Sequence, residues 1–196
     1  MRKMRGAEVY GRLFAAICKG AAMTSTRFKT WTGILDERTC VDCKNKQGTV
    51  YDRGRRIVPW PPLHMHCRCA IARLKAVAAG TATDRGMDGA DWWLQYMDAL
   101  PDYYITMDEA EAAGWNRKRG DLHLKCPEKM IDGGEYENKD GHLPTAAGRK
   151  WYEADINYRQ GHRGTDRIVY SNDGLVFVTY DHYRTFYEVV KEAKQQ

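Results

Sequence analysis

Four short runs near the C-terminus indicate the fold class, and the first of them is residues 151–158, WYEADINY. Apolar and polar residues alternate in this run and in three later ones, at residues 167–170, 175–180 and 183–190. An alternation with a period of two predicts β-strands, because successive side chains of a strand point to opposite faces of the sheet. Residues 172–174, Asn-Asp-Gly, predict a hairpin turn between two of these strands. We therefore expect an antiparallel sheet.

Upstream of these runs the periodicity is helical. Residues 88–100 place apolar side chains three and four positions apart, and Pro101 ends the pattern. Thr106 and Glu109 have the spacing of a capping box, which predicts the start of another helix. Helices followed by strands predict an α+β fold, with the N-terminal helices packed on the antiparallel β-sheet.

Charge and composition divide the chain into two parts. Residues 1–86 carry 17 Lys and Arg against 6 Asp and Glu, and residues 87–196 carry 14 against 20, so the net charges are +11 and −6. The small, polar segment 79–87 has no apolar period and predicts a flexible linker. We therefore expect a Cys- and His-rich domain at residues 1–78, a linker, and the α+β domain at residues 88–196.

The first domain has few features of a large hydrophobic core. Helical spacing of apolar residues predicts helices at residues 1–25 and 70–79, and residues 26–69 form short pieces rich in Gly, Pro and basic residues. Such a small helical and irregular domain needs a further source of stability, such as a metal ion.

Composition also excludes some classes of protein. The 196 residues carry a net charge of +5 and have a mean hydropathy of −0.67, without a long apolar run free of charge, so we expect no membrane association. Residues 13–17 are too short and too poorly flanked for the apolar core of a secretory signal. We expect no export signal at this end.

Cysteines and histidines cluster between residues 40 and 69. Cys40 and Cys43 have CxxC spacing, and the second group is His64, His66, Cys67 and Cys69. These are the ligand types of structural zinc, which takes four in a tetrahedron. We favour a structural zinc bound by Cys40, Cys43, Cys67 and Cys69, with His64 and His66 as alternative ligands. A disulfide or unligated thiols remain open readings. No glutamate accompanies the histidines as a catalytic zinc site requires.

Residues 26–75 resemble a family of phage proteins. The matching features are Trp31, the run 36–43 (DERTCVDC), Gly48, and the PPLHMHCRC ending at residues 61–69. They are similar to the C-terminal part of the phage minor head, or head-morphogenesis, proteins. The resemblance implies a structural or delivery element that associates with portal or head proteins.

Polar residues that interrupt the strands suggest catalysis. They are Glu153, Asp155, Asn157, Arg163, Arg167, Asp181, His182 and Tyr183. A carboxylate and an imidazole can act as base and acid while two guanidinium groups hold a phosphate. The alternative is that these side chains are merely the solvated face of an antiparallel sheet, and the alternation alone favours that alternative.

A second resemblance favours the catalytic interpretation. Residues 88–186 resemble the barnase family of bacterial guanyl-preferring ribonucleases, in register and without a gap. The matches include Pro101-Asp, Tyr104-Ile-Thr106, Gly114-Trp115, Leu143-Pro144, Glu153-Ala-Asp-Ile-Asn-Tyr158, Arg163, Asp166-Arg-Ile168 and Asp181-His-Tyr183. The resemblance implies a microbial-ribonuclease fold and an endoribonuclease that needs no cofactor for catalysis.

The resemblance also implies roles for individual residues. Glu153 takes the proton of the ribose 2′-hydroxyl, and His182 protonates the departing 5′-oxygen, which leaves a 2′,3′-cyclic phosphate. Arg163 and Arg167 hold the scissile phosphate, and Tyr183 contacts the phosphate or the base. Because the reaction needs a 2′-hydroxyl, the substrate is RNA and not DNA.

Four positions depart from the family pattern. Met107 stands where the family has a phosphate-binding lysine, and Gly134 where it has a supporting aspartate. In the base-binding loop Asn138 is retained, but Lys139 replaces an arginine and Asp140 a glutamate. Guanine preference is implied, with a shorter carboxylate to recognise the base.

Together the two resemblances suggest a modular toxin. It would be associated with a virion or secreted, and would cut RNA in the cytoplasm of a target cell. Its maker would need a small acidic immunity protein of the barstar type that covers the arginines and the histidine. The main alternative is a virion structural protein whose nuclease-like domain is inert and serves interaction. A third reading is that the basic half binds nucleic acid and localises the enzyme.

Overall fold

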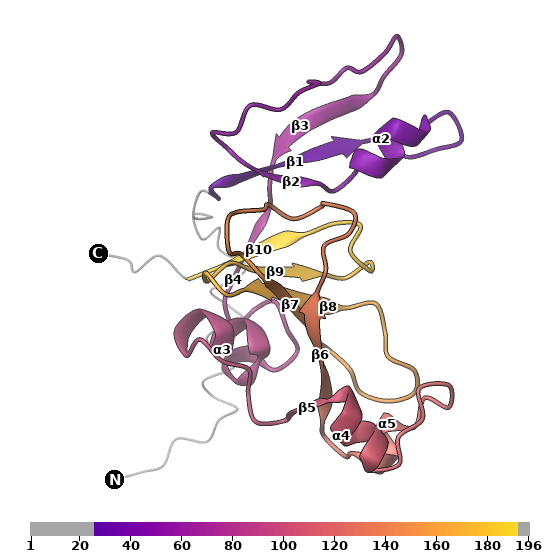
Figure 1. Cartoon of the computed structure of the whole chain (residues 1–196), viewed down its shortest axis with the longest axis vertical. Coiled ribbons are helices and arrows are strands. Elements are labelled where there is room, and N and C mark those ends of the chain that lie inside the picture. Colours follow the sequence, from indigo (N-terminus) through magenta and orange to yellow (C-terminus); the bar gives the residue numbers. More distant parts are fainter. Residues whose placement is uncertain (1–25, 192–196) are drawn as a thin grey trace, which may run out of the picture.

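The computed structural model describes residues 26–191 and contains two β-sheets (Figure 1). The larger sheet has seven strands in the order β4-β10-β9-β8-β7-β6-β5. Its strands are β4 (Ala76–Ala78), β5 (Tyr104–Thr106), β6 (Met130–Tyr136), β7 (Trp151–Asp155), β8 (Arg167–Ser171), β9 (Val176–Thr179) and β10 (Tyr187–Val190). The four predicted strand regions are confirmed as β7 to β10. Neighbouring strands are antiparallel except at the two edges, where β5 pairs with β6 and β4 with β10 in parallel.

Side chains of the central strands alternate between the two faces of the sheet, and both faces are buried. On one face Ala154, Ile168 and Val178 pack in a first core cluster, and on the other Val169 and Phe177 pack in a second. The hairpin between β8 and β9 is confirmed: Gly174 has a φ of +84°, and its amide donates to the Ser171 carbonyl over 3.1 Å. A sheet covered on both faces leaves only selected positions for polar side chains.

Helices lie along one face and one end of the large sheet. They are η1 (Gly86–Asp88), α3 (Ala90–Tyr96), α4 (Met107–Ala112) and α5 (Leu122–Lys125). The predicted capping box is confirmed, because the Glu109 amide donates to Thr106 Oγ1 and the Glu109 carboxylate accepts from the Thr106 amide. None of the helices in residues 26–191 combines the length and apolar character needed to span a bilayer.

A small three-stranded sheet forms the N-terminal part of the described chain. Its strands are β1 (Phe28–Gly33), β2 (Val50–Asp52) and β3 (Cys69–Arg73), in the order β2-β1-β3, with α2 (Val41–Lys46) between β1 and β2. We call residues 26–74 the small module. The prediction of a helical and irregular domain is thus wrong, because its main element is a sheet. The helix expected at residues 1–25 lies outside the described residues.

The helix expected at residues 70–79 is also wrong, because this segment forms β3 and β4. β3 pairs with β1, and β4 adds an edge strand to the large sheet beside β10. Pairing with two existing strands outweighs the helical preference of an alanine-rich segment.

The segment expected to be a flexible linker, residues 79–87, is packed into the fold. Ala79 and Ala82 are buried. The buried carboxylate of Asp91 accepts hydrogen bonds from the amides of Gly80 and Ala82, at 2.7 and 2.9 Å, and from the Thr83 hydroxyl. The small polar residues of this segment therefore form a tight hydrogen-bonded turn and not a flexible linker. The exact division into domains stays a prediction.

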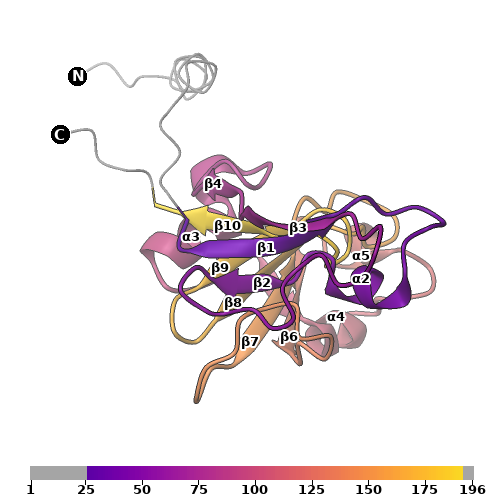
Figure 2. The same ribbon diagram turned by 90° about the horizontal axis from the view of Figure 1, so that it is seen from above.

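The small module shares a hydrophobic core with the large sheet. Phe28, Val50 and Leu74 belong to the same buried cluster as Val169 and Phe177, and the Phe28 and Phe177 rings are 5.3 Å apart. In both views the small sheet lies against the part of the large sheet near β8 to β10 (Figures 1 and 2). The two sheets form one packed body.

Candidate active site

Glu153 lies on the face of β7 that is turned toward the second core cluster. Alternation along β7 places Trp151, Glu153 and Asp155 on this face and Ala154 on the other. The Tyr183 hydroxyl donates a hydrogen bond to Glu153 Oε2. Gly133 on β6 leaves room for the carboxylate, since a β-carbon there would lie 2.9 Å from Glu153 Cγ. The position of Glu153 is therefore fixed from two sides.

Arg163 and Arg167 converge on one buried carboxylate, that of Asp155. Arg163 donates two hydrogen bonds to Asp155, at 2.5 and 2.7 Å, and Arg167 Nε lies 3.1 Å from Asp155 Oδ1. The Asp155 side chain is only 2% exposed. Burial opposes the charge of Arg163, but the hydrogen bonds and charge of Asp155, with the nearby charge of Glu153, raise its pKa. Both guanidinium groups are thus held in place before any substrate binds.

Asp155 is one of the polar residues that the sequence marks as candidates for catalysis, but the sequence predicts no specific role for it. It stands two positions after Glu153 in an alternating strand and so shares its face. Its role is to hold the two arginines, which the alternation alone does not reveal.

His182 and Tyr183 sit in a strained loop between β9 and β10. Both have left-handed backbones, with φ of +57° and +67°, a conformation that costs roughly 1–3 kcal/mol for each such residue. Asp181 holds the loop: its Oδ1 accepts from the amides of Arg184 and Thr185, at 3.1 and 2.8 Å. Burial works against the charge of Asp181, but these hydrogen bonds lower its pKa.

The loop presents the two side chains differently. His182 is exposed, with its ring centroid 4.8 Å from that of Tyr183. Tyr183 is partly buried and stacks on Tyr136, with the centroids 5.2 Å apart. Burial, and then the neighbouring Glu153, raises the pKa of the Tyr183 hydroxyl, so it stays a proton donor to Glu153 at neutral pH. The structure thus brings Glu153, Arg163, Arg167 and Tyr183 together and places His182 at the edge of the group.

The predicted base-binding loop is closed by Asn138. Its side-chain amide donates to the Leu143 carbonyl over 2.9 Å, and its Oδ1 accepts from the Leu143 amide over 3.0 Å. Lys139 forms an ion pair with Glu137, and Asp140 is exposed. Tyr136, at the end of β6, joins this loop to Tyr183 and hence to Glu153.

The family-model comparison matches the part of the chain that carries these residues. The model described as ribonuclease matches residues 94–190, from within α3 to the end of β10. Among curated proteins, a ribonuclease of Heyndrickxia coagulans is 50% identical over 97 residues, which cover 50% of this chain and 88% of that protein. The chain belongs to the ribonuclease family.

Two further relatives are longer than the matched region. The ribonucleases of Bacillus intermedius and Bacillus pumilus are each 50% identical over 97 residues, and the match covers 59% of their length. Among solved structures, ribonuclease Sa2 with guanosine-2′-cyclophosphate is 22% identical and covers 61% of this chain and 99% of its own, with a TM-score of 0.38. The enzyme is an endoribonuclease. The family match, at residues 94–190, begins after the small module.

Met107 stands where the resemblance to the family predicts a phosphate-binding lysine, and the structure shows what surrounds it. Met107, the first residue of α4, packs against the cluster that contains Ala110, Trp115 and Leu122. An apolar side chain that packs in this way supplies no cation to a phosphate. Arg163 and Arg167, which Asp155 holds, are cations that the structure places near Glu153 and Tyr183.

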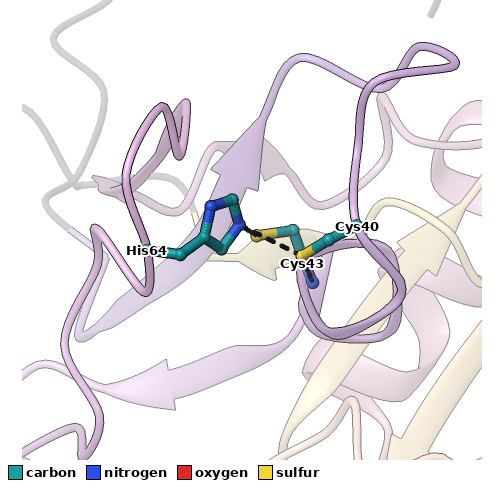
Figure 3. A group of neighbouring side chains, drawn as sticks. All are labelled: Cys40, Cys43 and His64. Atoms are coloured by element: carbon teal, nitrogen blue, oxygen red, sulfur yellow. Dashed lines mark hydrogen bonds between the residues drawn. The ribbon is translucent and has the colours of Figure 1, made fainter.

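Cysteines and a histidine of the small module form a second group with possible ligand chemistry (Figure 3). Cys40 Sγ lies 3.2 Å from His64 Nε2, and Cys43 Sγ lies 3.6 Å from both His64 Nε2 and Cys67 Sγ. Cys69 is within 4.8 Å of Cys43 and Cys67. The described cysteines, at positions 40, 43, 67, 69 and 126, are free thiols.

The surroundings of the cluster suit metal ligands. Cys40 caps α2 by accepting from the Cys43 amide. Hydrogen bonds with the backbone of Leu63 and Cys69 lower the pKa of the Cys67 thiol to about 6, which favours the thiolate. His64 Nδ1 donates to the Met65 carbonyl over 2.8 Å, which leaves Nε2 free as a ligand. His66, one of the predicted alternatives, is outside the groups that the structure brings together in residues 26–191.

Proposed function

We propose that this endoribonuclease cuts RNA by transphosphorylation, with Glu153 as general base and His182 as general acid. Glu153 takes the proton of the 2′-hydroxyl, the 2′-oxygen attacks phosphorus, and the bond to the 5′-oxygen breaks. His182 protonates the leaving oxygen, and a 2′,3′-cyclic phosphate remains. The convergence of Arg163 and Arg167 beside Glu153 supports this proposal most directly, since it offers a phosphate site next to the base.

Asp155 and Tyr183 would position these groups without touching the substrate's reacting atoms. Asp155 fixes two guanidinium groups whose donors can stabilise charge on the phosphate oxygens in the transition state. Tyr183 holds the Glu153 carboxylate in one orientation. The reaction uses only side chains of this chain and proceeds without a metal ion.

We also propose a preference for guanine at the cleaved nucleotide. Asn138 shapes the loop, and Asp140 offers a carboxylate that can accept from the N–H groups of the guanine edge. Lys139, which is paired with Glu137, would contribute through its charge rather than by bidentate recognition. The shorter Asp140 would weaken the preference relative to glutamate.

The small module would carry a structural zinc ion. In a tetrahedral site with Zn–S near 2.3 Å and Zn–N near 2.0 Å, neighbouring ligand atoms are about 3.5–3.8 Å apart. The ligand atoms of Cys40, Cys43 and His64 all lie within 4.8 Å of one another, with His64 Nε2 3.2 Å from Cys40 Sγ and 3.6 Å from Cys43 Sγ. Cys67 belongs to a second group, with Cys43 and Cys69, and adjoins the first through Cys43, at 3.6 Å. We therefore propose these four as ligands, with His64 in the place that the sequence prediction gave to Cys69.

The biological role that we propose is that of a toxin. The phage-head-like small module would deliver the ribonuclease, from a virion or by secretion, to the cytoplasm of a target cell. A small acidic immunity protein would protect the producer by covering the site around Arg163, Arg167 and His182. The addition of a basic, Cys- and His-rich module to a ribonuclease supports this role.

The catalytic proposal is tested by RNA digestion with the full chain, because the small module shares a core with the ribonuclease. We expect cleavage to a 2′,3′-cyclic phosphate, and a loss of at least a hundredfold in Glu153→Ala and in His182→Ala. The matched controls are Glu37→Ala and His66→Asn, two exposed residues of the small module, which should keep full activity. Undiminished cleavage by either catalytic variant would refute the assignment.

Metal independence is tested by adding EDTA to the same assay and recording thermal unfolding in the same buffer. Cleavage should persist wherever the protein remains folded. Loss of cleavage at an unchanged unfolding temperature would show that a metal takes part in the reaction.

A further inference from the structure

A cavity of about 510 Å³ lies between the small module and the base-binding loop. We call it the seam cavity. One wall comes from α2, β2 and the turn after β2, and the other from residues 140–145. Its polar lining includes Asp42, Lys46, Tyr51, Arg55 and Asp140. A volume of this size is within the range of small-molecule sites and is sufficient for one nucleotide.

Hydrogen bonds across the seam hold the two walls together. The Val50 amide donates to the His142 carbonyl over 2.7 Å, and His142 Nε2 lies 3.2 Å from the Asn45 carbonyl, which can accept its proton. Asn138 closes the same loop from within. The cavity is therefore formed before a ligand binds, so that little ordering is needed on binding.

The charged groups of the seam cavity are available to a ligand. Within residues 26–191 no ion pair involves Arg55, Lys46, Asp42 or Asp140. The Lys46 ammonium lies over the Trp31 ring, 5.6 Å from its centroid. Arg55 and Tyr51 line the same cavity. Burial raises the pKa of the Tyr51 hydroxyl, and the charge of Arg55 partly opposes this shift.

This combination of groups matches a nucleotide better than a simple anion. Two cations can bind a phosphate, whereas two carboxylates would repel it. The same carboxylates can accept hydrogen bonds from amino and imino groups of a base. Tyr51 offers an aromatic ring on which a base can stack. Each kind of group in the cavity thus has a partner on one nucleotide.

We propose that the seam cavity is an RNA subsite, which binds the nucleotide on the 5′ side of the one held by the loop around Asn138 and Asp140, outside the two nucleotides that flank the cleaved bond. Arg55 and Lys46 bind its phosphate, and Tyr51 stacks on its base. The proposal rests on the ribonuclease function proposed above. Such a subsite gives the small module a part in substrate binding. Its cations offset the net charge of −6 on residues 87–196, which opposes binding of RNA.

The test compares short and long substrates with the full-length protein. Arg55→Ala removes a cation from the cavity, and Arg56→Ala removes the same charge from an exposed neighbour that does not line it. For a ten-nucleotide RNA we expect Arg55→Ala to lower kcat/KM by about tenfold, and for a dinucleoside monophosphate by less than twofold. Arg56→Ala should change neither by more than twofold. Equal losses in the two variants, or equal losses on both substrates, would overturn the subsite.

A binding measurement separates this proposal from the catalytic one. The probes are 2′-deoxy oligonucleotides of two and six nucleotides, which cannot undergo transphosphorylation. The native protein and Arg56→Ala should bind the longer probe about tenfold more tightly than the shorter, and Arg55→Ala should show nearly equal affinities. Cleavage of RNA without this length dependence would overturn the subsite alone. Length-dependent binding without cleavage of RNA would overturn the catalytic proposal and keep the binding site.

Discussion

Gly48 lies directly against the backbone of Arg184, so that a β-carbon on Gly48 would be 2.0 Å from the Arg184 carbonyl oxygen. Gly48 has a φ of +78°, and its amide donates to the Trp31 carbonyl over 2.9 Å. The turn after α2 in the small module therefore touches the loop that carries His182 and Tyr183. Only glycine fits both the backbone conformation and this contact.

Substitution of Gly48 should disturb stability and catalysis together. In Gly48→Ala the new methyl group must displace the backbone of residues 181–185, and the left-handed conformation adds strain. We expect a loss of about 2–4 kcal/mol in the free energy of unfolding and a fall in kcat/KM of at least tenfold. Urea unfolding and RNA cleavage measure the two effects.

Gly54→Ala is the matched control. A β-carbon at Gly54 would have no neighbour within 4 Å, so this variant should stay within about 0.5 kcal/mol of the native stability and keep its activity. Native-like behaviour of Gly48→Ala would show that the two parts are not in contact at this point in solution.

Neutralising Asp155 should release both arginines. In Asp155→Asn the guanidinium groups of Arg163 and Arg167 lose their buried counter-charge, and breaking such a pair costs about 3–5 kcal/mol. We expect this loss in urea unfolding and a fall in kcat of at least tenfold at a temperature where the variant is folded. Asp102→Asn, at an exposed position without a side-chain ion pair in residues 26–191, should do neither. A stable, fully active Asp155→Asn would remove the positioning role.

Much of the ribonuclease part could be predicted from local patterns. The alternation in residues 151–190 was sufficient for strands β7 to β10, and the capping box for the start of α4. The family motif indicated Glu153, Arg163, Arg167 and His182 as candidates. Strands β5 and β6 have no comparable alternation, since β6 contains two consecutive glycines, and they were missed.

The remaining features depend on contacts between segments far apart in the chain. Residues 76–78 become a strand because β10 is beside them, and the supposed linker is ordered because Asp91 accepts its amides. Likewise Asp155 can hold Arg163 and Arg167 only because the fold places both arginines next to its carboxylate. Periodicity within one segment contains no information about such partners, which is why these three features escaped prediction.

Glu188 should make stability depend on pH. Burial raises its pKa to about 7, and its Oε2 is buried without a hydrogen-bond partner in residues 26–191. Because the folded state favours the protonated form, the stabilisation is fully present below the unfolded pKa near 4.5 and is lost as pH rises through about 7. The full shift corresponds to roughly 3 kcal/mol; since the side chain is partly exposed, we expect about 1–2 kcal/mol.

The measurement is urea unfolding between pH 5 and pH 8. The native protein should lose stability over this interval relative to Glu188→Gln, whose side chain cannot ionise, whereas exposed Glu37→Gln should follow the native curve. Parallel curves for the native protein and Glu188→Gln would show that Glu188 titrates normally.

Zinc binding should depend on His64 and not on His66, two histidines separated by a single residue. His64 Nε2 lies 3.2 Å from Cys40 Sγ, whereas His66 is outside the cluster. We expect about one zinc ion per chain by elemental analysis in the native protein and in His66→Asn. His64→Asn should lose most of the metal and about 3 kcal/mol of stability, which lowers the unfolding temperature by roughly 6–12 °C. Asparagine is chosen because His66 has a φ of +64°, which asparagine tolerates. Retention of zinc by His64→Asn together with its loss in Cys69→Ser would instead make Cys69 the fourth ligand.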